Sequence, residues 1–237
     1  MIDIYAYTSQ GGREFNEDFV GYTHTSDGAV AVLSDGLGGV GGGEIASSII
    51  VDTVIDEPYD CEDPAEWLSE RLARADARVK EQQHTLHNEM KSTAVALRIS
   101  GDRAVWAHIG DSRLYFIRDG VIAEVTADHS VAFKKYLSGR ISRSQILSDE
   151  DKNSLVSSVG GPDACVPELG GRFTHPGDGF VLCSDGAWEN LLDQEIAFDR
   201  LKAQTAEEWA RLLLLRILDR MAPDADNLSV ITVLITE

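Results

Sequence analysis

The sequence predicts an α+β fold in which two antiparallel β-sheets pack face to face and α-helices flank them, giving an α-β-β-α sandwich. Runs of β-type sequence follow one another through hairpin turns, and two long helical patterns interrupt them. A doubly wound parallel sheet would require strand and helix to alternate along the chain, and they do not. The 237 residues can bury a full core, so we expect one domain over residues 1–237.

The N-terminal half begins with β-type runs and then becomes helical. Asp27-Gly28 is good turn chemistry between two strands, and a glycine-dense loop precedes the first helical pattern. Asp63 as N-cap and Pro64 at the first helical position predict the start of a second, longer helix. The predicted strands are 2–8, 19–25 and 29–34, and the predicted helices are 44–55 and about 64–90.

The C-terminal half returns to strands. Gly101-Asp102 and Asp119-Gly120 predict hairpin turns between consecutive strands. Residues 129–153 are polar and charged without a strong core face, which makes them the candidate for a mobile flap of helical character. The predicted strands are 92–100, 103–110, 113–118, 121–126, 154–159, 166–173, 179–183 and 228–236, and the predicted helix is 205–221.

The composition excludes several classes of protein. Forty acidic residues against 21 basic give a net charge of −19, which opposes binding to nucleic acids and to anionic membranes. The three cysteines are widely spaced, so neither a disulfide framework nor a zinc knuckle is indicated. The sequence has no signal-peptide pattern and no apolar run of roughly 18 residues, so we expect a cytoplasmic protein.

Acidic residues stand at the ends of five predicted strands. If these ends converge, the carboxylates share one cleft, and like charges that close require cations. Oxygen ligands favour hard cations such as Mg²⁺ or Mn²⁺, and none of the six histidines has the spacing of a metal ligand. The alternative is a set of solvated turn carboxylates in a very acidic protein. The residues concerned are Glu17-Asp18, Asp35, Asp111, Asp185 and Asp226.

Arg13 favours the metal interpretation. It lies four residues before Glu17, and an arginine beside a divalent-metal cluster is a natural clamp for a phosphate group. Carboxylates, cations and one arginine together suggest metal-assisted phosphate hydrolysis. Taken alone, an arginine at such a position is more often an ordinary surface residue.

Five short motifs occur in order along nearly the whole chain. They are Arg13-x-x-Asn16-Glu17-Asp18, Asp35-Gly36-Leu37-Gly38-Gly39, Gly110-Asp111-Ser112-Arg113, Ser184-Asp185-Gly186 and Asp226-Asn227. In sequence and spacing they resemble the motifs of the metal-dependent protein phosphatases, the type 2C serine/threonine phosphatases, and in particular the compact bacterial members. The resemblance implies the two-sheet fold expected above.

The resemblance also implies the metal ligands. Asp35 is expected to bridge two ions, Mg²⁺ or Mn²⁺. Glu17 and the carbonyl of Gly36 are expected to complete one site, and Asp185 and Asp226 the other. Two ions in such an arrangement lower the pKa of a bridging water and produce hydroxide, which attacks phosphorus in line with the leaving serine or threonine oxygen.

The remaining implied roles concern the substrate. Asp111, together with Asp185, resembles the ligands of a third, weaker metal, Arg13 is expected to hold the phosphate, and Asp18 to hydrogen-bond metal-bound water. The implied function is hydrolysis of phosphoserine and phosphothreonine on proteins, opposing a cognate serine/threonine kinase in a bacterium. Family precedent implies a monomer.

The chain departs from the family pattern at three places. Leu37 stands where many eukaryotic relatives carry a histidine that could act as general acid. Lys91-Ser92-Thr93 replaces the usual Gly-Thr-Thr or Gly-Ser-Thr, and Asp151-Lys152-Asn153 replaces a stretch that often holds histidine and arginine. The last two bear on the flap and on substrate choice rather than on the metal chemistry.

Three rival interpretations stay open. Residues 36–41 satisfy G-x-G-x-x-G after a strand, which is the dinucleotide-binding fingerprint, but Asp35 would point a carboxylate at the pyrophosphate. A degenerate phosphatase fold could serve as a regulatory module that binds phosphoproteins, although the expected acidic positions and Arg13 are all present. A calcium-binding structural domain is a weaker alternative, because the EF-hand pattern is absent.

Overall fold

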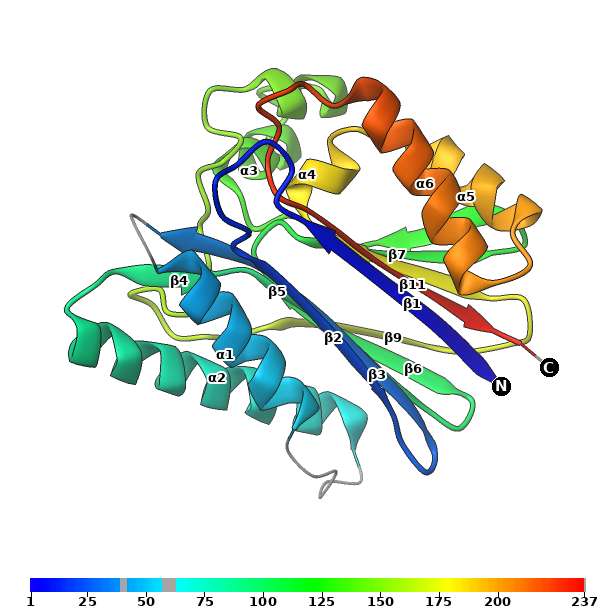
Figure 1. The fold of residues 1–237 in the computed structure, drawn as a ribbon, viewed down its shortest axis with the longest axis horizontal. Helices are drawn as coiled ribbons and strands as arrows, with labels where there is room; N and C mark the ends of the chain where they lie inside the picture. Colours follow the sequence, from blue (N-terminus) through cyan, green and yellow to red (C-terminus); the bar gives the residue numbers. More distant parts are fainter. Residues whose placement is uncertain (39–41, 57–62, 237) are drawn as a thin grey trace.

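The computed structural model describes residues 1–38, 42–56 and 63–236, and in it two antiparallel sheets pack face to face (Figure 1). In spatial order, the first sheet consists of β1 (Ile2–Ser9), β11 (Leu228–Ile235), β10 (Gly179–Cys183), β7 (Arg113–Arg118) and β8 (Val121–Val125). The second consists of β2 (Asp18–His24), β3 (Gly28–Gly38), β5 (Ala94–Ser100), β6 (Arg103–Ile109) and β9 (Glu168–Phe173), with β4 (Met90–Ser92) paired to the end of β3.

Helices cover the outer faces of both sheets, which confirms the predicted α+β sandwich (Figure 1). The six-stranded sheet is covered by α1 (Gly43–Ile55) and α2 (Pro64–Leu86), and the five-stranded sheet by α4 (Asp185–Trp188), α5 (Asp193–Lys202) and α6 (Ala206–Arg220). The predicted flap segment contains α3 (Val131–Leu137) and the 3₁₀ helix η1 (Arg143–Ser148).

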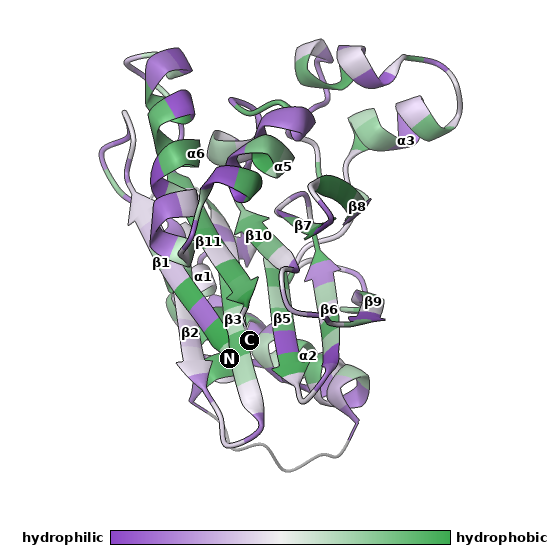
Figure 2. Cartoon of the chain, turned by 90° about the vertical axis from the view of Figure 1, so that its right-hand side faces the viewer, coloured by the Kyte–Doolittle hydropathy of each residue, from purple (hydrophilic) through white to green (hydrophobic). Residues whose placement is uncertain are grey.

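Strand alternation divides the core into three apolar layers. On β6, Trp106 points between the two sheets, whereas Val105 and Ala107 point towards α1 and α2. The central strands of the sheets are therefore buried on both faces, and their sequences are nearly continuous apolar runs. Hydrophobic residues are green in Figure 2, and these strands are mostly green there. Among the described residues, no helix has the length and apolar content needed to cross a membrane.

Asp63 caps α2 as predicted, because its side chain accepts a hydrogen bond from the Ala65 amide and Pro64 occupies the first turn. The expected end of this helix near Met90 is wrong. His87 adopts a left-handed conformation with φ of 51° and ends α2, and Met90 then pairs with β3 as part of β4. No glycine marks this stop, and the weaker signal of Asn88 just after it was not used.

One other expectation is wrong, one helix was not predicted, and part of one motif falls outside the described chain. The strand predicted at 154–159 is wrong, because this segment forms only isolated bridges, Leu155 with Ser130 and Val159 with Ser92. The helix α5 was not predicted, because only a few of its residues are buried. Residues 39–41 of the G-x-G-x-x-G stretch lie outside the described residues.

The orientation of α6 gives a direct test of this packing. Leu213 is fully buried against the five-stranded sheet, whereas Leu215 is 66% exposed on the same helix. Leu213→Ala should lower the free energy of unfolding by about 2–5 kcal/mol, because it opens a cavity in the core. Leu215→Ala is the matched control and should change it by less than about 0.5 kcal/mol in urea unfolding. If both substitutions lowered the free energy of unfolding equally, the orientation of α6 on the five-stranded sheet would be wrong.

Candidate active site

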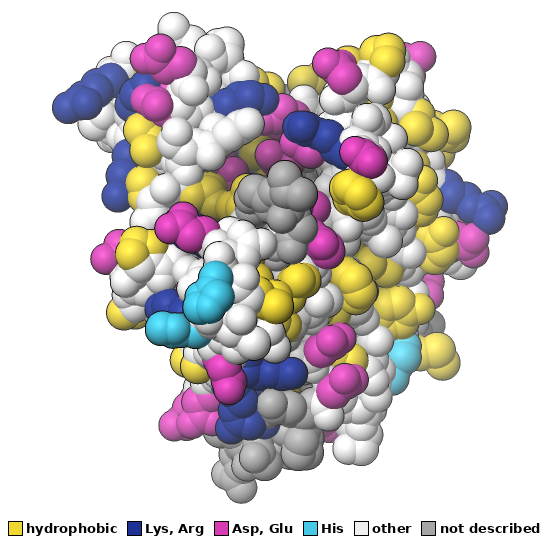
Figure 3. All heavy atoms as spheres, turned by 60° about the vertical axis from the view of Figure 1, so that its left-hand side comes forward, with side chains coloured by type: hydrophobic (Ala, Val, Ile, Leu, Met, Phe, Trp, Pro, Cys, Tyr) yellow, Lys and Arg dark blue, Asp and Glu magenta, His cyan; other side chains and the backbone are white. Residues whose placement is uncertain are grey.

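Seven of the eight residues singled out in the sequence line one cavity of about 480 Å³ at the end of the sandwich where β3 meets β4. Acidic side chains gather in a hollow on this side of the molecule (Figure 3). The cavity is also lined from the flap side by Asn153 and Leu155. The seven residues are Arg13, Glu17, Asp35, Gly36, Asp111, Asp185 and Asp226.

Asp35 occupies β3 just where the pairing partner of this strand changes from β5 to β4. Its amide donates to Thr93 Oγ1 at 3.0 Å, and the Thr93 amide donates back to the Asp35 carbonyl at 2.9 Å. Ser92 Oγ donates to the same carbonyl at 2.6 Å. The Ser92-Thr93 pair, which the sequence marked only as part of a departure from the family pattern, therefore fixes the backbone of the central carboxylate.

Two glycines let β3 pass against the first turn of α1. A Cβ on Gly36 would lie 2.3 Å from the Gly43 carbonyl oxygen, and a Cβ on Gly43 would lie 2.7 Å from the Glu17 carboxylate. The Gly36 amide also donates to the Glu17 carbonyl at 3.1 Å. Glycine at both positions thus brings the Glu17 side chain and the Gly36 backbone together.

Asn227 positions the loop that carries Arg13 and Glu17. Its Oδ1 accepts from the Glu17 amide, and its Nδ2 donates to the carbonyls of Gln10 and Phe15, each at 2.9 Å. The sequence contained Asn227 within a motif but gave it no role. Its three contacts span more than 200 residues of sequence, so no local pattern could have revealed them.

Asp185 reaches the cavity from the five-stranded sheet, and Asp111 reaches it from the crossover between β6 of the six-stranded sheet and β7 of the five-stranded sheet. Asp185 begins α4 directly after β10, and Asp111 follows β6. Trp188 on α4 donates from its indole nitrogen to the Asp111 carbonyl at 3.0 Å, which ties the two acidic positions together. Arg113 stacks over Trp188, with its guanidinium carbon 3.5 Å from the ring centroid.

Asp18 is the predicted site residue that does not line the cavity. It pairs with Asp35 across β2 and β3 and is only 2% exposed. Its Oδ2 accepts from Ser184 Oγ at 2.7 Å, while its Oδ1 is buried without a hydrogen-bond partner. Because buried carboxylate oxygens are normally paired, this oxygen marks a place where a further group fits.

Arg13 lies at the rim of the cavity. Its Nη2 donates to Asp226 Oδ2 at 2.8 Å, and both side chains are about half exposed. Exposed ion pairs of this kind contribute only about 0–1 kcal/mol, so a phosphate group can compete for the guanidinium.

The pKa values of the acidic side chains are raised, because burial and mutual repulsion oppose their ionisation. Burial raises the pKa of Asp18 to about 6, of Asp111 to about 7 and of Asp185 to about 8. Repulsion adds to burial in the last two, from Asp128 and Asp111 respectively. Burial and the nearby Asp18 raise the pKa of Asp35 well above its usual range. Divalent cations would remove this penalty, so the oxygen-only ligand set and its electrostatics fit a metal site.

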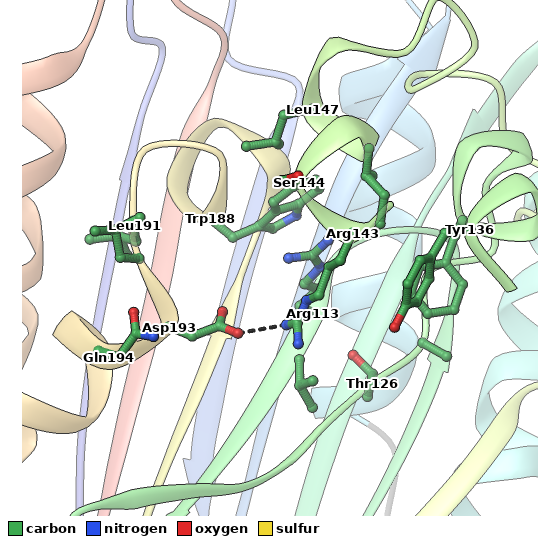
Figure 4. Close-up of a pocket in the computed structure, with 15 residues that line it drawn as sticks. Arg113, Thr126, Tyr136, Arg143, Ser144, Leu147, Trp188, Leu191, Asp193 and Gln194 are labelled. Atoms are coloured by element: carbon green, nitrogen blue, oxygen red, sulfur yellow. Dashed lines mark hydrogen bonds and ion pairs between the residues drawn. The ribbon is translucent and has the colours of Figure 1, made fainter. Parts of the chain in front are cut away.

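A second cavity, of about 590 Å³, lies between α3, η1 and the start of α5 and contains none of the predicted site residues (Figure 4). Its cationic groups are already paired. Arg143 contacts Asp193 at 2.5 Å, and Arg113 makes a two-bond contact with Asp128 at 2.7 Å. The predicted metal ligands thus converge in the acidic cavity and not in this one.

The chain resembles known phosphatases over most of its length. The sequence model for Protein phosphatase 2C matches residues 9–213. A putative protein phosphatase 2C-type from Streptococcus pyogenes serotype M6 is 30% identical over 191 residues, 78% of each chain. The solved serine/threonine phosphatase of S. agalactiae has a TM-score of 0.90 and 27% identity, covering 99% of this chain and all of the other. The catalytic domain of PstP, solved with two manganese ions, has a TM-score of 0.84 and 26% identity over 100% and 99% of the two chains.

The two-sheet sandwich is that of a metal-dependent phosphatase. The chain belongs to the protein phosphatase 2C family and is a serine/threonine protein phosphatase.

The raised pKa values predict how metal and pH act together on stability. In the folded, metal-free protein Asp18, Asp111 and Asp185 bind protons up to about pH 6–8, whereas in the unfolded chain they lose them near pH 3.9. The folded state binds more protons in this window, so these groups lower stability as the pH rises from about 4 to about 8. Mn²⁺ should therefore raise the melting temperature more at pH 8 than at pH 5.5.

Circular dichroism melting with and without Mn²⁺ at the two pH values checks this expectation. Asp185→Asn removes one of the carboxylates with a raised pKa, so the metal-free variant should lose less stability as the pH rises. If Mn²⁺ raised the melting temperature equally at both pH values, the assignment of the raised pKa values to these carboxylates would be wrong.

Proposed function

We propose that the acidic cavity hydrolyses phosphoserine and phosphothreonine on protein substrates, with two Mg²⁺ or Mn²⁺ ions as cofactors. Asp35 would be shared between the two ions, with Glu17 and the Gly36 carbonyl on one side and Asp185 and Asp226 on the other. Asp111 would contribute, with Asp185, to a third and weaker ion. The single observation that carries the proposal is the convergence of these residues and Arg13 in one cavity.

The donor set agrees with this assignment. It contains carboxylate and carbonyl oxygens without sulfur or imidazole, which suits hard divalent cations. Bound there, such ions supply Lewis acidity, which activates water as a nucleophile and offsets the charge of the phosphate. The solved PstP domain, whose fold this chain shares, contains two manganese ions.

The protein's own groups orient the substrate and handle protons. Arg13 would leave its exposed contact with Asp226 and donate two parallel hydrogen bonds to the substrate phosphate. Asp18, buried behind Asp35 with a free Oδ1, would accept a hydrogen bond from water in the cavity. With a pKa of about 6, Asp18 lies near the range in which a carboxyl group can exchange a proton at neutral pH.

The substrate class follows from the relatives, several of which are named serine/threonine phosphatases. We extend this to a phosphoprotein substrate and a cognate serine/threonine kinase for the present chain. The expected cytoplasmic location, the monomeric state and the role of residues 129–153 as a flap stay predictions.

Hydrolysis of p-nitrophenyl phosphate and of a phosphothreonine peptide, each with Mn²⁺, Mg²⁺ or EDTA, tests the function. The wild-type protein should need metal, and Asp35→Asn should nearly abolish kcat because it removes the shared ligand. Asp102→Asn is the matched control, since Asp102 is exposed in the turn at the opposite end of β5, and it should keep full activity. Absence of metal-dependent turnover with metals still bound would favour the regulatory-module interpretation.

The role of Arg13 makes a separate prediction. Arg13→Ala should raise KM about 10- to 100-fold and change kcat little, because the guanidinium binds the phosphate equally in the ground and transition states. Arg13→Lys keeps the charge but loses the fork and should give an intermediate KM. Steady-state kinetics at saturating metal checks this. An unchanged KM in Arg13→Ala would show that another group binds the phosphate.

A further inference from the structure

A second cluster of metal-ligating side chains lies outside the acidic cavity. His108 on β6 stands directly opposite Glu168 on β9 in the antiparallel register, so both side chains leave the same face of the sheet. His129, in the loop after β8, brings its ring to 4.7 Å from that of His108, centroid to centroid. Within the part of the chain that the structure describes, one ligand atom from each of these three residues lies within 4.8 Å of the others.

Spacing along the sequence gave no sign of this arrangement. The three residues are separated by 21 and 39 positions in sequence, and no local spacing links them. The register of β6 and β9 places His108 opposite Glu168. A hydrogen bond from the His129 amide to the Gly110 carbonyl, at 2.9 Å, holds His129 beside them.

The state of the His108 ring is an independent observation that points to a ligand. The side chain is only 2% exposed, and its Nε2 lies 2.8 Å from the Ala127 carbonyl. A carbonyl oxygen only accepts, so Nε2 carries the proton and Nδ1 holds a lone pair. That Nδ1 is buried without a partner. Burial also lowers the pKa of His108, which keeps the ring neutral and the lone pair available near neutral pH.

We propose that His108 Nδ1, His129 Nε2 and the Glu168 carboxylate bind a divalent transition-metal ion, with Zn²⁺ as the best match and water completing the coordination. Two imidazoles and one carboxylate form a ligand set suited to Zn²⁺ and poorly suited to Mg²⁺. The contact of His108 Nε2 with the Ala127 carbonyl is the kind of outer contact that orients a metal-bound histidine.

Loading this site has a consequence for the neighbouring acidic cavity. In the free protein the Gly110 amide donates to His129 Nδ1 at 3.3 Å, so the ring proton is on Nε2, which faces Glu168 Oε2 at 3.4 Å. A cation on Nε2 moves that proton to Nδ1, where it opposes the Gly110 amide hydrogen. Occupancy therefore weakens the contact at Gly110, the residue next to Asp111.

Binding can be measured without relying on catalysis. The full chain carrying Asp35→Asn, which weakens the acidic cavity as a competing site, is labelled with ¹⁵N-histidine and titrated with Zn²⁺. We expect two of the six histidine ring systems, assigned to His108 and His129 by substitution, to move to metal-bound shifts at one equivalent. The amide signal of Gly110, followed in uniformly labelled protein, should move with them. Mg²⁺ at the same concentration should leave the rings unchanged.

Variants identify the ligands. Glu168→Gln should weaken Zn²⁺ binding at least tenfold in calorimetric titration, and it should fold normally because the Glu168 side chain is 57% exposed. His129→Asn should abolish binding at this site. The matched controls, Glu150→Gln and His175→Asn, alter exposed residues elsewhere and should bind Zn²⁺ as the parent does.

Two results would overturn the proposal. In the first, the ring signals of His108 and His129 do not shift at saturating Zn²⁺. The two residues would then serve only as a structural link between β6 and the loop after β8. The other is equal Zn²⁺ affinity in Glu168→Gln and in the parent. Neither result bears on the phosphatase proposal, because the titration measures binding rather than turnover.

Discussion

The structure depends on holding several carboxylates together around one cavity. Asp35, Asp185 and Asp111 converge from three strand ends of two different sheets, and burial makes each of them resist ionisation. Packed apolar groups cannot relieve such repulsion. The surrounding protein therefore has to fix the backbone rigidly and leave the charge to be balanced by cations.

The rigid support comes mainly from neutral hydrogen-bonding groups. Thr93 and Ser92 clamp the Asp35 backbone, and Asn227 fastens the loop that carries Glu17. These neutral groups bind the backbone and add no charge to the carboxylate cluster. A lysine in their place would form ion pairs with the carboxylate oxygens that a metal ion needs. Arg13 at the rim is exposed and weakly held, so it can exchange its partner Asp226 for a phosphate group.

The sequence predicted the layers of the fold from hairpin turns and helical periodicity. It predicted the residues of the acidic cavity from carboxylates at strand ends together with the resemblance to the type 2C phosphatases. It could not predict interactions that depend on distant partners. The contacts of Asn227 cross the length of the chain, and the approach of His108 to Glu168 depends on strand register. The end of α2 at His87 was missed because a non-glycine residue adopts the left-handed conformation there.

The pairing of β1 with β11 also bears on how the acidic cavity forms during folding. These strands are the first and last along the chain, and they pair over their full lengths, from Ile2 with Ile235 to Ser9 with Leu228. Contacts of such high sequence separation form slowly, because a long loop has to close first. Asp226 and Asn227 immediately precede β11, so the closure that pairs β1 with β11 also brings Asp226 to Arg13 and Asn227 to the loop that carries Glu17. Completion of the acidic cavity is thus tied to a slow, long-range step of folding.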